Sequence, residues 1–264
     1  MPTQLEKAET FRALHEGEPF LFPNPWDAGS AKVLEALGFK ALATTSGGFA
    51  FTLGRLDGDV TLDEVSQHTR ALDQASALPV AVDLENGYGP AAEDAARAIT
   101  RAAEAGAVGG SIEDWDPQSG IYELSHAVER VAAAAAAARE LDFPFTFTAR
   151  AENHLRRNPD LDDTITRLQA YEAAGADVVY APGLASGDEI RAVSDATSKP
   201  QNVLAHAGLT LGEITEAGGQ RISVGSQLTW VAAGALARVA EEMRETGSFA
   251  AFGERVPIKK WLGG

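Results

Sequence analysis

The stretch VAVDLENGYG, residues 80–89, ends a β-branched apolar run with two carboxylates, Asp83 and Glu85, just before a glycine-rich turn. Because side chains alternate along a strand, both acids point to the same face. Glu113 ends the next apolar run, in SIED, and Asp57 follows the preceding run, in TSGGFAFTLGRLDGD. Four carboxylates in one place would repel one another unless some are protonated or a cation lies between them.

These four acids offer a metal ion only oxygen ligands, which favours Mg²⁺, or Mn²⁺, over zinc. Since Mg²⁺ keeps several water ligands, we expect Asp83 to coordinate it directly. We expect the other three to bind it through water: Asp57, Glu85 and Glu113. The alternative is a set of solvated loop acids or helix caps, but four acids on adjacent strand ends are unusual for solvation alone.

Two further features accompany the acids: an arginine, and a glycine-containing turn with free backbone amides. TARAEN aims Arg150 and Glu152 the same way, and an arginine there can bind a substrate carboxylate bidentately. An ion pair from Arg150 to Glu113 or Glu152 is the alternative, and both can hold together. The turn TTSGG, Thr44 to Gly48, places bare amides beside the Ser46 hydroxyl and forms an anion cradle. With a metal, this pattern indicates a pocket for a 2-oxo or 2-hydroxy acid.

Eight short β-rich runs alternate with longer amphipathic segments along the chain, and they must position these residues. Strand and helix in alternation predict a parallel sheet, and eight units predict a closed (β/α)₈ TIM-type barrel in a single domain, residues 1–264. An N-terminal helix over 3–17 would cover the bottom of the barrel. A doubly wound open sheet is the rival, but no Gly-x-Gly-x-x-Gly opens a helix. The predicted strands begin near residues 19, 40, 78, 109, 145, 177, 200 and 221.

The composition bounds the function further. The chain has 264 residues, 45% of them hydrophobic, and a net charge of −16, which disfavours nucleic acid and anionic membrane as partners. The absence of cysteine excludes disulfides, thiolate metal sites and a cysteine acid. The N-terminus MPTQLEKAETFRALHEG is charged and has no apolar signal core, so we expect a cytoplasmic protein whose partner is a small anionic carboxylate.

The order Ser-Gly-Gly, a distant Asp, DLENGYG, IED and ARAEN resembles the isocitrate lyase and phosphoenolpyruvate mutase superfamily over most of the chain. The resemblance implies a (β/α)₈ barrel whose last helix is often exchanged between subunits of a dimer or tetramer. It implies Mg²⁺ bound directly by Asp83 and through water by Asp57, Glu85 and Glu113. It also assigns the substrate carboxylate to Ser46, Gly47, Gly48 and Arg150.

The loop after the fourth strand departs from the family's lyases. Isocitrate and methylisocitrate lyases carry Lys-Lys-Cys-Gly-His there, and the cysteine protonates the leaving enolate. This chain has WDPQSGIYELSH, without the cysteine and without the asparagine and basic residues of the phosphonate mutases. We therefore expect Mg²⁺-dependent C–C cleavage, as lyase or decarboxylase, through a metal-stabilised enolate. Solvent, or Tyr122 if the loop closes, would supply the proton.

Further residues and other classes of protein complete the expectations. On the seventh predicted strand, Asn202 and His206 have the same parity, so His206 could reach the mouth and Asn202 a lower level. A Schiff-base aldolase is disfavoured because Lys199 falls at the start of a strand. Phosphate binding at SVGSQ, near Gly225, stays open for a phosphonomutase or another phosphonate enzyme, and a non-catalytic 2-oxo acid binding protein is the rival outside enzymology. The expected catalytic residues are Asp57, Glu113, Arg150 and Tyr122, and the expected substrate-binding residues are Thr44, Ser46, Gly47, Gly48, Asp83, Arg150, Asn202 and His206.

The tail FAAFGERVPIKKWLGG carries apolar side chains beyond the last barrel helix. A lone subunit would have to expose them, so we expect a homodimer or homotetramer.

Overall fold

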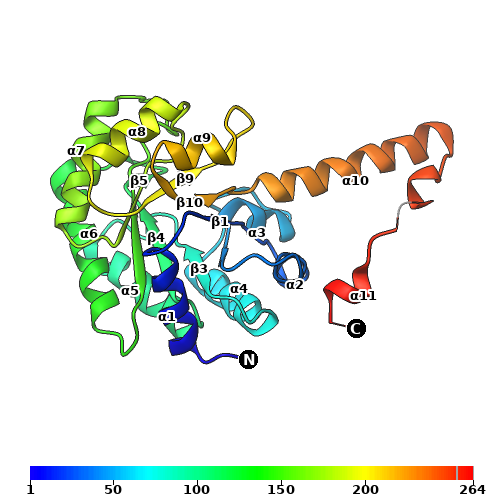
Figure 1. Cartoon of the computed structure of the whole chain (residues 1–264), viewed down its shortest axis with the longest axis horizontal. Coiled ribbons are helices and arrows are strands. Elements are labelled where there is room, and N and C mark those ends of the chain that lie inside the picture. The colour runs from blue at the N-terminus through cyan, green and yellow to red at the C-terminus, as the bar shows by residue number, and fades with distance from the viewer. Residues whose placement is uncertain (254, 264) are drawn as a thin grey trace.

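The structure, a computed structural model, describes residues 1–253 and 255–263. Eight parallel strands form one sheet in the order β1-β10-β9-β8-β7-β4-β3-β2, surrounded by helices (Figure 1). The first and last strands of this order, β1 and β2, also lie close together: the Ala43 amide of β2 donates to the carbonyl of Pro23, just after β1, at 3.0 Å. This nearly closed barrel confirms the predicted fold. The strands are β1 (Phe20–Phe22), β2 (Leu42–Ala43), β3 (Val80–Asp83), β4 (Gly109–Glu113), β7 (Thr146–Arg150), β8 (Val178–Tyr180), β9 (Gln201–Leu204) and β10 (Gly219–Ser223).

One side chain ties the ends of three strands together at the seam. The Asn24 amide nitrogen donates to the Thr44 carbonyl at 2.8 Å, after β2. Its oxygen accepts from the amides of Val224 and Gly225, just after β10, at 2.9 and 3.0 Å. An asparagine suits this position because its amide group can donate and accept at the same time.

The helices alternate with the strands as the amphipathic segments predict, and two short elements add to the pattern. Strands β5 (Trp115–Asp116) and β6 (Gly120–Ile121) form an antiparallel hairpin in the loop after β4. Helix α3 (Ser46–Thr52) forms after β2, where the sequence predicts a turn. The other helices of the repeat are α2 (Ala28–Ala36), α4 (Leu62–Ala75), α5 (Ala92–Glu104), α6 (Leu124–Arg139), α7 (Leu161–Ala173), α8 (Gly187–Ala196), α9 (Leu211–Glu216) and α10 (Gln227–Thr246).

Helix α1 (Gln4–Leu14) covers the amino-terminal end of the barrel, as predicted. Its Phe11 ring packs against Phe22 of β1, with ring centroids 5.4 Å apart. A Cβ on Gly109 would lie 2.8 Å from the Phe11 ring, so only glycine lets this aromatic side chain enter between the strands. Lys7 is buried and pairs with Asp73 at 2.7 Å, which fixes the helix against the end of α4.

Helix α10 leaves the barrel and projects away from it, and the chain then turns back through the short segments η1 (Ala250–Gly253) and α11 (Ile258–Trp261) (Figure 1). Thr229 is the buried residue of α10. Trp230, Val231 and Leu236 are 44%, 67% and 70% exposed. Within the described ranges, no helix combines the length and apolar character that crossing a bilayer requires.

Candidate active site

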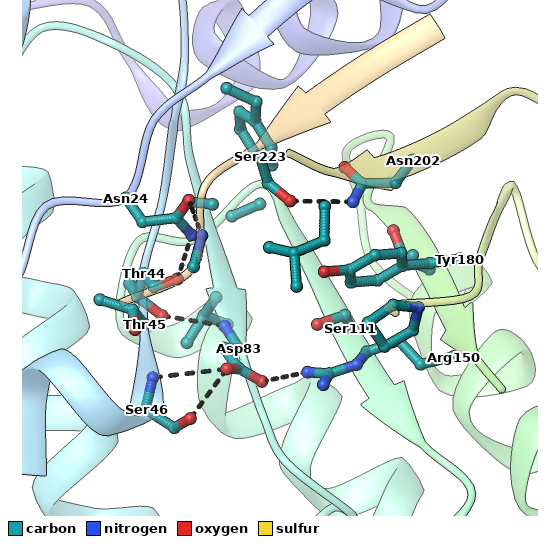
Figure 2. A pocket seen from close by; sticks show the side chains of 18 of the residues that line it. Asn24, Thr44, Thr45, Ser46, Asp83, Ser111, Arg150, Tyr180, Asn202 and Ser223 are labelled. Carbon is teal, nitrogen blue, oxygen red and sulfur yellow. Dashed lines mark hydrogen bonds and ion pairs between the residues drawn. The ribbon is translucent and has the colours of Figure 1, made fainter. Parts of the chain in front are cut away.

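A cavity of about 180 Å³ lies inside the barrel. Figure 2 shows Asp83 and Arg150 joined by an ion pair on one side of it, with Ser223 and Asn202 on the opposite side. Six of the sequence-predicted site residues line this cavity: Thr44, Ser46, Asp57, Asp83, Arg150 and Asn202. Six others do not line it: Gly47, Gly48, Glu85, Glu113, Tyr122 and His206.

Asp83, at the end of β3, is the centre of the polar contacts in the cavity. One carboxylate oxygen accepts from Arg150 at 2.9 Å. The other accepts from the Ser46 hydroxyl at 3.0 Å and from the Ser46 amide at 3.3 Å. The Asp83 amide donates to the Thr44 hydroxyl at 2.9 Å, which links it to the end of β2. The side chain is therefore held by Arg150 of β7 and by the first turn of α3, and the backbone by Thr44.

The Ser-Gly-Gly sequence has a packing role that its resemblance to an anion cradle does not reveal. Thr45 caps α3, and its hydroxyl accepts from the Gly48 amide at 3.3 Å. A Cβ on Gly48 would lie 2.5 Å from the Thr45 methyl group and 2.6 Å from the Thr229 hydroxyl. A Cβ on Gly47 would lie 2.9 Å from the Ser226 hydroxyl and 3.3 Å from the Asp57 carboxyl carbon. Both glycines let α3 approach its neighbours closely.

Arg150, at the end of β7, is surrounded by carboxylates. Besides Asp83, its guanidinium contacts Glu113 at 2.9 Å and Glu152 at 2.7 Å, and its side chain is 10% exposed. Burial opposes the charge, but these three acids more than compensate and raise the pKa of Arg150. Arg150 thus forms the ion pairs with Glu113 and Glu152 that the sequence indicates as an alternative to substrate binding. The guanidinium still lines the cavity, beside the Tyr180 ring.

Glu113 and Glu152 lie behind Arg150, away from the cavity. Burial, with repulsion from Glu152, raises the pKa of Glu113 well above its usual value. Burial also raises the pKa of Glu152. Arg156 stabilises the pair from the other side, 3.3 Å from Glu113 and 3.5 Å from Glu152, and its guanidinium lies over the Trp115 ring. Sequence reasoning missed Arg156 because its loop position gave no indication of what it contacts.

Asp57 and Glu85 approach the same mouth from two loops. Burial, followed by repulsion from Asp83 and Asp57, raises the pKa of Glu85 to about 7. The Tyr88 hydroxyl donates to Glu85 at 3.2 Å. Both residues adopt positive φ, 47° and 61°, which is uncommon for side chains of this size and is typical of a tightly constrained turn. Partial burial raises the pKa of Asp57 as well.

The side chains at this mouth fit a hard divalent cation. Asp57, Asp83 and Glu85 repel one another and offer only oxygen atoms as ligands. In the part of the chain that the structure describes, no three acidic or histidine side chains are close enough to share an ion directly. One direct ligand with water between the ion and the other acids satisfies both observations, and Asp83 has the central place. Glu113 is instead engaged by Arg150 and Arg156.

Two predicted residues lie apart from the cavity. The Tyr122 ring packs under Arg130, and its hydroxyl is 3.4 Å from the Asn86 amide nitrogen. His206 is exposed, and its Nδ1 accepts from the Gly208 amide at 3.0 Å. Asn202 does line the cavity and donates to the Ser223 hydroxyl at 3.0 Å (Figure 2).

Several polar residues of the cavity were not singled out from the sequence. They are Asn24, Ser111, Thr148, Tyr180, Arg221 and Ser223. The alternation along β10, which gives Arg221 and Ser223 the same parity, was the available signal. In the SVGSQ segment considered for phosphate binding, at Gly225 and Ser226, the amides of Val224 and Gly225 are already engaged by Asn24, as described above.

Comparison with known proteins gives a consistent result. The family model for phosphoenolpyruvate phosphomutase matches residues 11–244. An uncharacterized protein of Mycobacterium tuberculosis is 33% identical over 213 residues, 80% of each chain. An oxaloacetate decarboxylase of Bradyrhizobium diazoefficiens is 32% identical over 84% of this chain and 78% of its own. A 2-methylisocitrate lyase of Halalkalibacterium halodurans is 29% identical over 98% of this chain and 89% of its own.

Solved structures share the fold over the whole chain. A candidate lyase/mutase from Burkholderia cenocepacia J2315 has a TM-score of 0.96 at 49% identity, over 99% of this chain and 97% of that chain. A phosphonopyruvate hydrolase solved with oxalate and Mg²⁺ has a TM-score of 0.86 at 22% identity, over 99% and 95% of the two chains. The second likeness concerns the fold alone.

Proposed function

Because this chain belongs to the phosphoenolpyruvate phosphomutase family of enzymes, within the isocitrate lyase superfamily, we propose that it cleaves a carbon–carbon bond of a small 2-oxo or 2-hydroxy carboxylic acid. The observation that carries the proposal is the Asp83 carboxylate, held between Ser46 and Arg150 in a cavity at the carboxyl ends of the strands. At about 180 Å³, this cavity is smaller than the roughly 300–1,000 Å³ of drug-sized pockets and suits a small acid.

Each residue has a proposed task. Arg150 and the first turn of α3, Ser46 to Gly48, bind the substrate carboxylate, since a guanidinium and backbone amides are the donors that carboxylates prefer. Asp83 would hold Mg²⁺, or Mn²⁺, directly, and Asp57 and Glu85 would bind it through water. Glu113 would keep Arg150 in place. The bound ion would polarise the substrate carbonyl group and stabilise the negative charge that develops as the bond breaks.

The proton that completes the reaction needs a source other than cysteine, because the chain contains none. We propose solvent as that source, since the cavity is open to water at the mouth where Asp57 is exposed. Tyr122 would take part only after the β5–β6 hairpin moves over the cavity.

Proton NMR on the purified protein with Mg²⁺ tests the proposal. The substrates are oxaloacetate, 2-methylisocitrate and phosphonopyruvate, and the variants are Asp83→Ala and, as a matched control, Asp59→Ala on the neighbouring loop. We expect one carbon acid to be consumed by the native protein and by Asp59→Ala, and at least about 10²-fold more slowly by Asp83→Ala. The Asp83→Ala sample also corrects for slow decarboxylation of oxaloacetate by Mg²⁺ alone.

Two other results would replace the proposal. Turnover of phosphonopyruvate alone would make the chain a phosphonate enzyme, the reaction class that the name of its family model indicates. Binding of these acids without consumption of any would leave a non-catalytic 2-oxo acid binding protein.

We also propose that the chain assembles as a homodimer or homotetramer through α10. This helix exposes Trp230, Val231 and Leu236 on a segment that projects from the barrel, and a second copy would cover them. We expect light scattering at micromolar concentration to give a multiple of the 27.7 kDa chain mass and Leu236→Glu to lower it. A native monomer would contradict this proposal.

A further inference from the structure

The floor of the cavity is formed by an arginine that no assigned role explains. Arg221, on β10, is 4% exposed and lines the cavity together with Thr148 and Asn202. Its Nε donates to the Asn202 side-chain oxygen at 2.8 Å, and one Nη donates to the Thr148 hydroxyl at 2.9 Å. The other Nη lies 3.2 Å from Nε2 of His15, the residue that ends α1 as its C-cap. These contacts fix the guanidinium at the level where α1 covers the barrel.

All three partners of this cation are neutral. His15 Nδ1 lies 2.8 Å from the Phe11 carbonyl, so Nδ1 carries the proton and Nε2 accepts from Arg221. Burial, then the Arg221 charge, lowers the pKa of His15 to about 3, so the ring is uncharged at neutral pH. Burial lowers the pKa of Arg221 to about 9, which leaves it protonated at neutral pH. A full positive charge therefore lies at the floor.

Three other buried cations of this chain have acidic partners, whereas Arg130, 1% exposed and outside this cavity, donates to the backbone carbonyls of Asn86 and Ala91. Arg150 contacts three carboxylates, Arg167 pairs with Asp114 and Asp163, and Lys7 pairs with Asp73. Among residues 1–253 and 255–263, no carboxylate pairs with Arg221 within 4.0 Å. Buried charges in proteins are normally paired, because an uncompensated one is costly. The missing negative charge is what an anionic ligand in the cavity would supply.

The space above Arg221 is open and polar. Small residues of β2, β3 and β4 line it, among them Ala43, Ala81 and Gly110. The hydroxyl groups of Ser111, Tyr180 and Ser223 face its centre (Figure 2). Burial raises the pKa of Tyr180 to about 12, so its hydroxyl stays protonated and can donate. The Tyr180 ring also lies beside Arg150, with the guanidinium carbon 5.3 Å from the ring centroid, so one continuous cavity connects the two arginines.

We propose that Arg221 forms a second anion subsite and that the substrate is a dianionic diacid. One end of the diacid, with the 2-oxo or 2-hydroxy group, lies at Asp83 and Arg150, as the proposed function requires. Its second carboxylate reaches the floor and pairs with Arg221, with Tyr180 as an additional donor. Mono-acids of the same head group fill only the mouth, so Arg221 selects diacids.

Binding calorimetry in Mg²⁺ with three unreactive probes tests this subsite. Oxalate occupies the mouth alone, whereas lactate and malate share a 2-hydroxy acid head and differ by the second carboxylate. Because hydrogen bonds between charged partners are among the strong ones, we expect the native protein to bind malate about 10- to 100-fold more tightly than lactate. We expect Arg221→Met to bind malate and lactate alike while its affinity for oxalate is unchanged, and Arg221→Lys to keep part of the difference.

The control variant is Arg167→Met, which truncates another buried arginine outside the cavity and is expected to keep the native malate-to-lactate ratio. Equal affinities of the native protein for malate and lactate would overturn the subsite, and this comparison needs no variant to fold. An equal loss of oxalate and malate binding in Arg221→Met would make Arg221 a structural residue. Tighter lactate binding in chloride or nitrate, without a preference for malate, would show that a free anion fills the floor. Absence of oxalate binding to the native protein would instead remove the proposed function.

Discussion

Arg150 and Arg221 are buried arginines that line one cavity, yet their surroundings differ completely. Arg150 is saturated by Asp83, Glu113 and Glu152, all within 2.9 Å. Arg221 has an amide oxygen, a hydroxyl and an uncharged imidazole around it. Carboxylates thus outnumber the guanidinium group around Arg150, whereas no carboxylate pairs with Arg221 among the described residues.

This difference shows what each region can bind. An excess of carboxylates over guanidinium groups at the mouth attracts a cation, and a carboxylate ligand there gains most once that cation is present. The floor attracts an anion without any cofactor. A cavity with these two ends is suited to a metal-bound acid that carries a second negative group.

The largest effect is expected from Arg150→Met, which removes the cation that Asp83, Glu113 and Glu152 share. We expect the activity to fall by about 10³-fold, because a preorganised donor to the reacting group is lost. We also expect the free energy of unfolding to fall by about 3–5 kcal/mol, because buried carboxylates lose their partner. Steady-state kinetics and urea unfolding measure the two losses.

Arg156→Met is the matched control for this variant. Arg156 contacts the same Glu113 and Glu152, but its side chain is 32% exposed and does not line the cavity. We expect less than about a tenfold loss of activity and about 1 kcal/mol of stability. Equal effects of the two variants would mean that Arg150 acts through the acids rather than on a ligand.

The floor is expected to respond to acid through His15. The folded protein keeps this ring uncharged down to a pKa of about 3, whereas an unfolded chain binds the proton near pH 6.5. The unfolded state therefore gains protons first, and stability is lost progressively as the pH falls from about 6.5 to 3. At pH 5 this amounts to about 2 kcal/mol.

Urea unfolding at pH 7.5 and pH 5.0 checks the contribution of His15. We expect His15→Gln to lose about 2 kcal/mol less than the native protein between the two pH values. His206→Gln, which replaces an exposed ring, serves as the control and should follow the native protein. An identical acid response of all three proteins would rule out the neutral His15 described here.

A smaller effect is expected at the wall of the mouth, where Gly48→Ala tests close packing. The new Cβ would lie 2.5 Å from the Thr45 methyl group and 2.6 Å from the Thr229 hydroxyl, so α3 has to shift. We expect a loss of about 1–3 kcal/mol in stability. Gly234→Ala on α10 is the control, since its Cβ would have a single ordinary contact at 3.7 Å. A neutral Gly48→Ala would show that the wall is loosely packed.

The smallest effect is expected from Tyr122→Phe, outside both regions. The hydroxyl lies beside Asn86 and does not line the cavity, so we expect less than about a threefold change in the rate of turnover. A loss of more than about tenfold would show that the β5–β6 hairpin closes over the cavity and brings Tyr122 to the substrate.

Much of the fold could be predicted because it depends on repeating local signals. The eight alternations of β-rich and amphipathic runs, together with glycines such as Gly38 and Gly106 at helix ends, indicated the barrel. Helix α3 was not predicted, since Ser-Gly-Gly favours a turn by local propensity. Its formation depends on the Thr45 cap and on contacts with Thr229, which is 184 residues further along the chain than Thr45.

The candidate site was predictable to the extent that parity and strand ends place side chains. Asp83 and Arg150 could be assigned to one mouth because parallel strands end at the same side of a barrel. The positions of Glu113, behind Arg150, and of Tyr122, outside the cavity, could not. Tyr122 depends on how the loop after β4 folds back, and a loop path has no periodic signal. Glu113 is the last residue of β4, and its role depends on Arg150 and Arg156, which pair with it from other parts of the chain.

The sequence by itself determined the barrel, the acids at its mouth and the family, because alternation and short motifs are local properties of the chain. Only the tertiary structure decided which charges are compensated. The counter-charges of Arg150 come from β3, β4 and the loop after β7. The neutral partners of Arg221 come from β7, β9 and the C-cap of α1. The electrostatic state of a buried group depends on distances across the barrel, and those distances exist only once all the strands have closed around it.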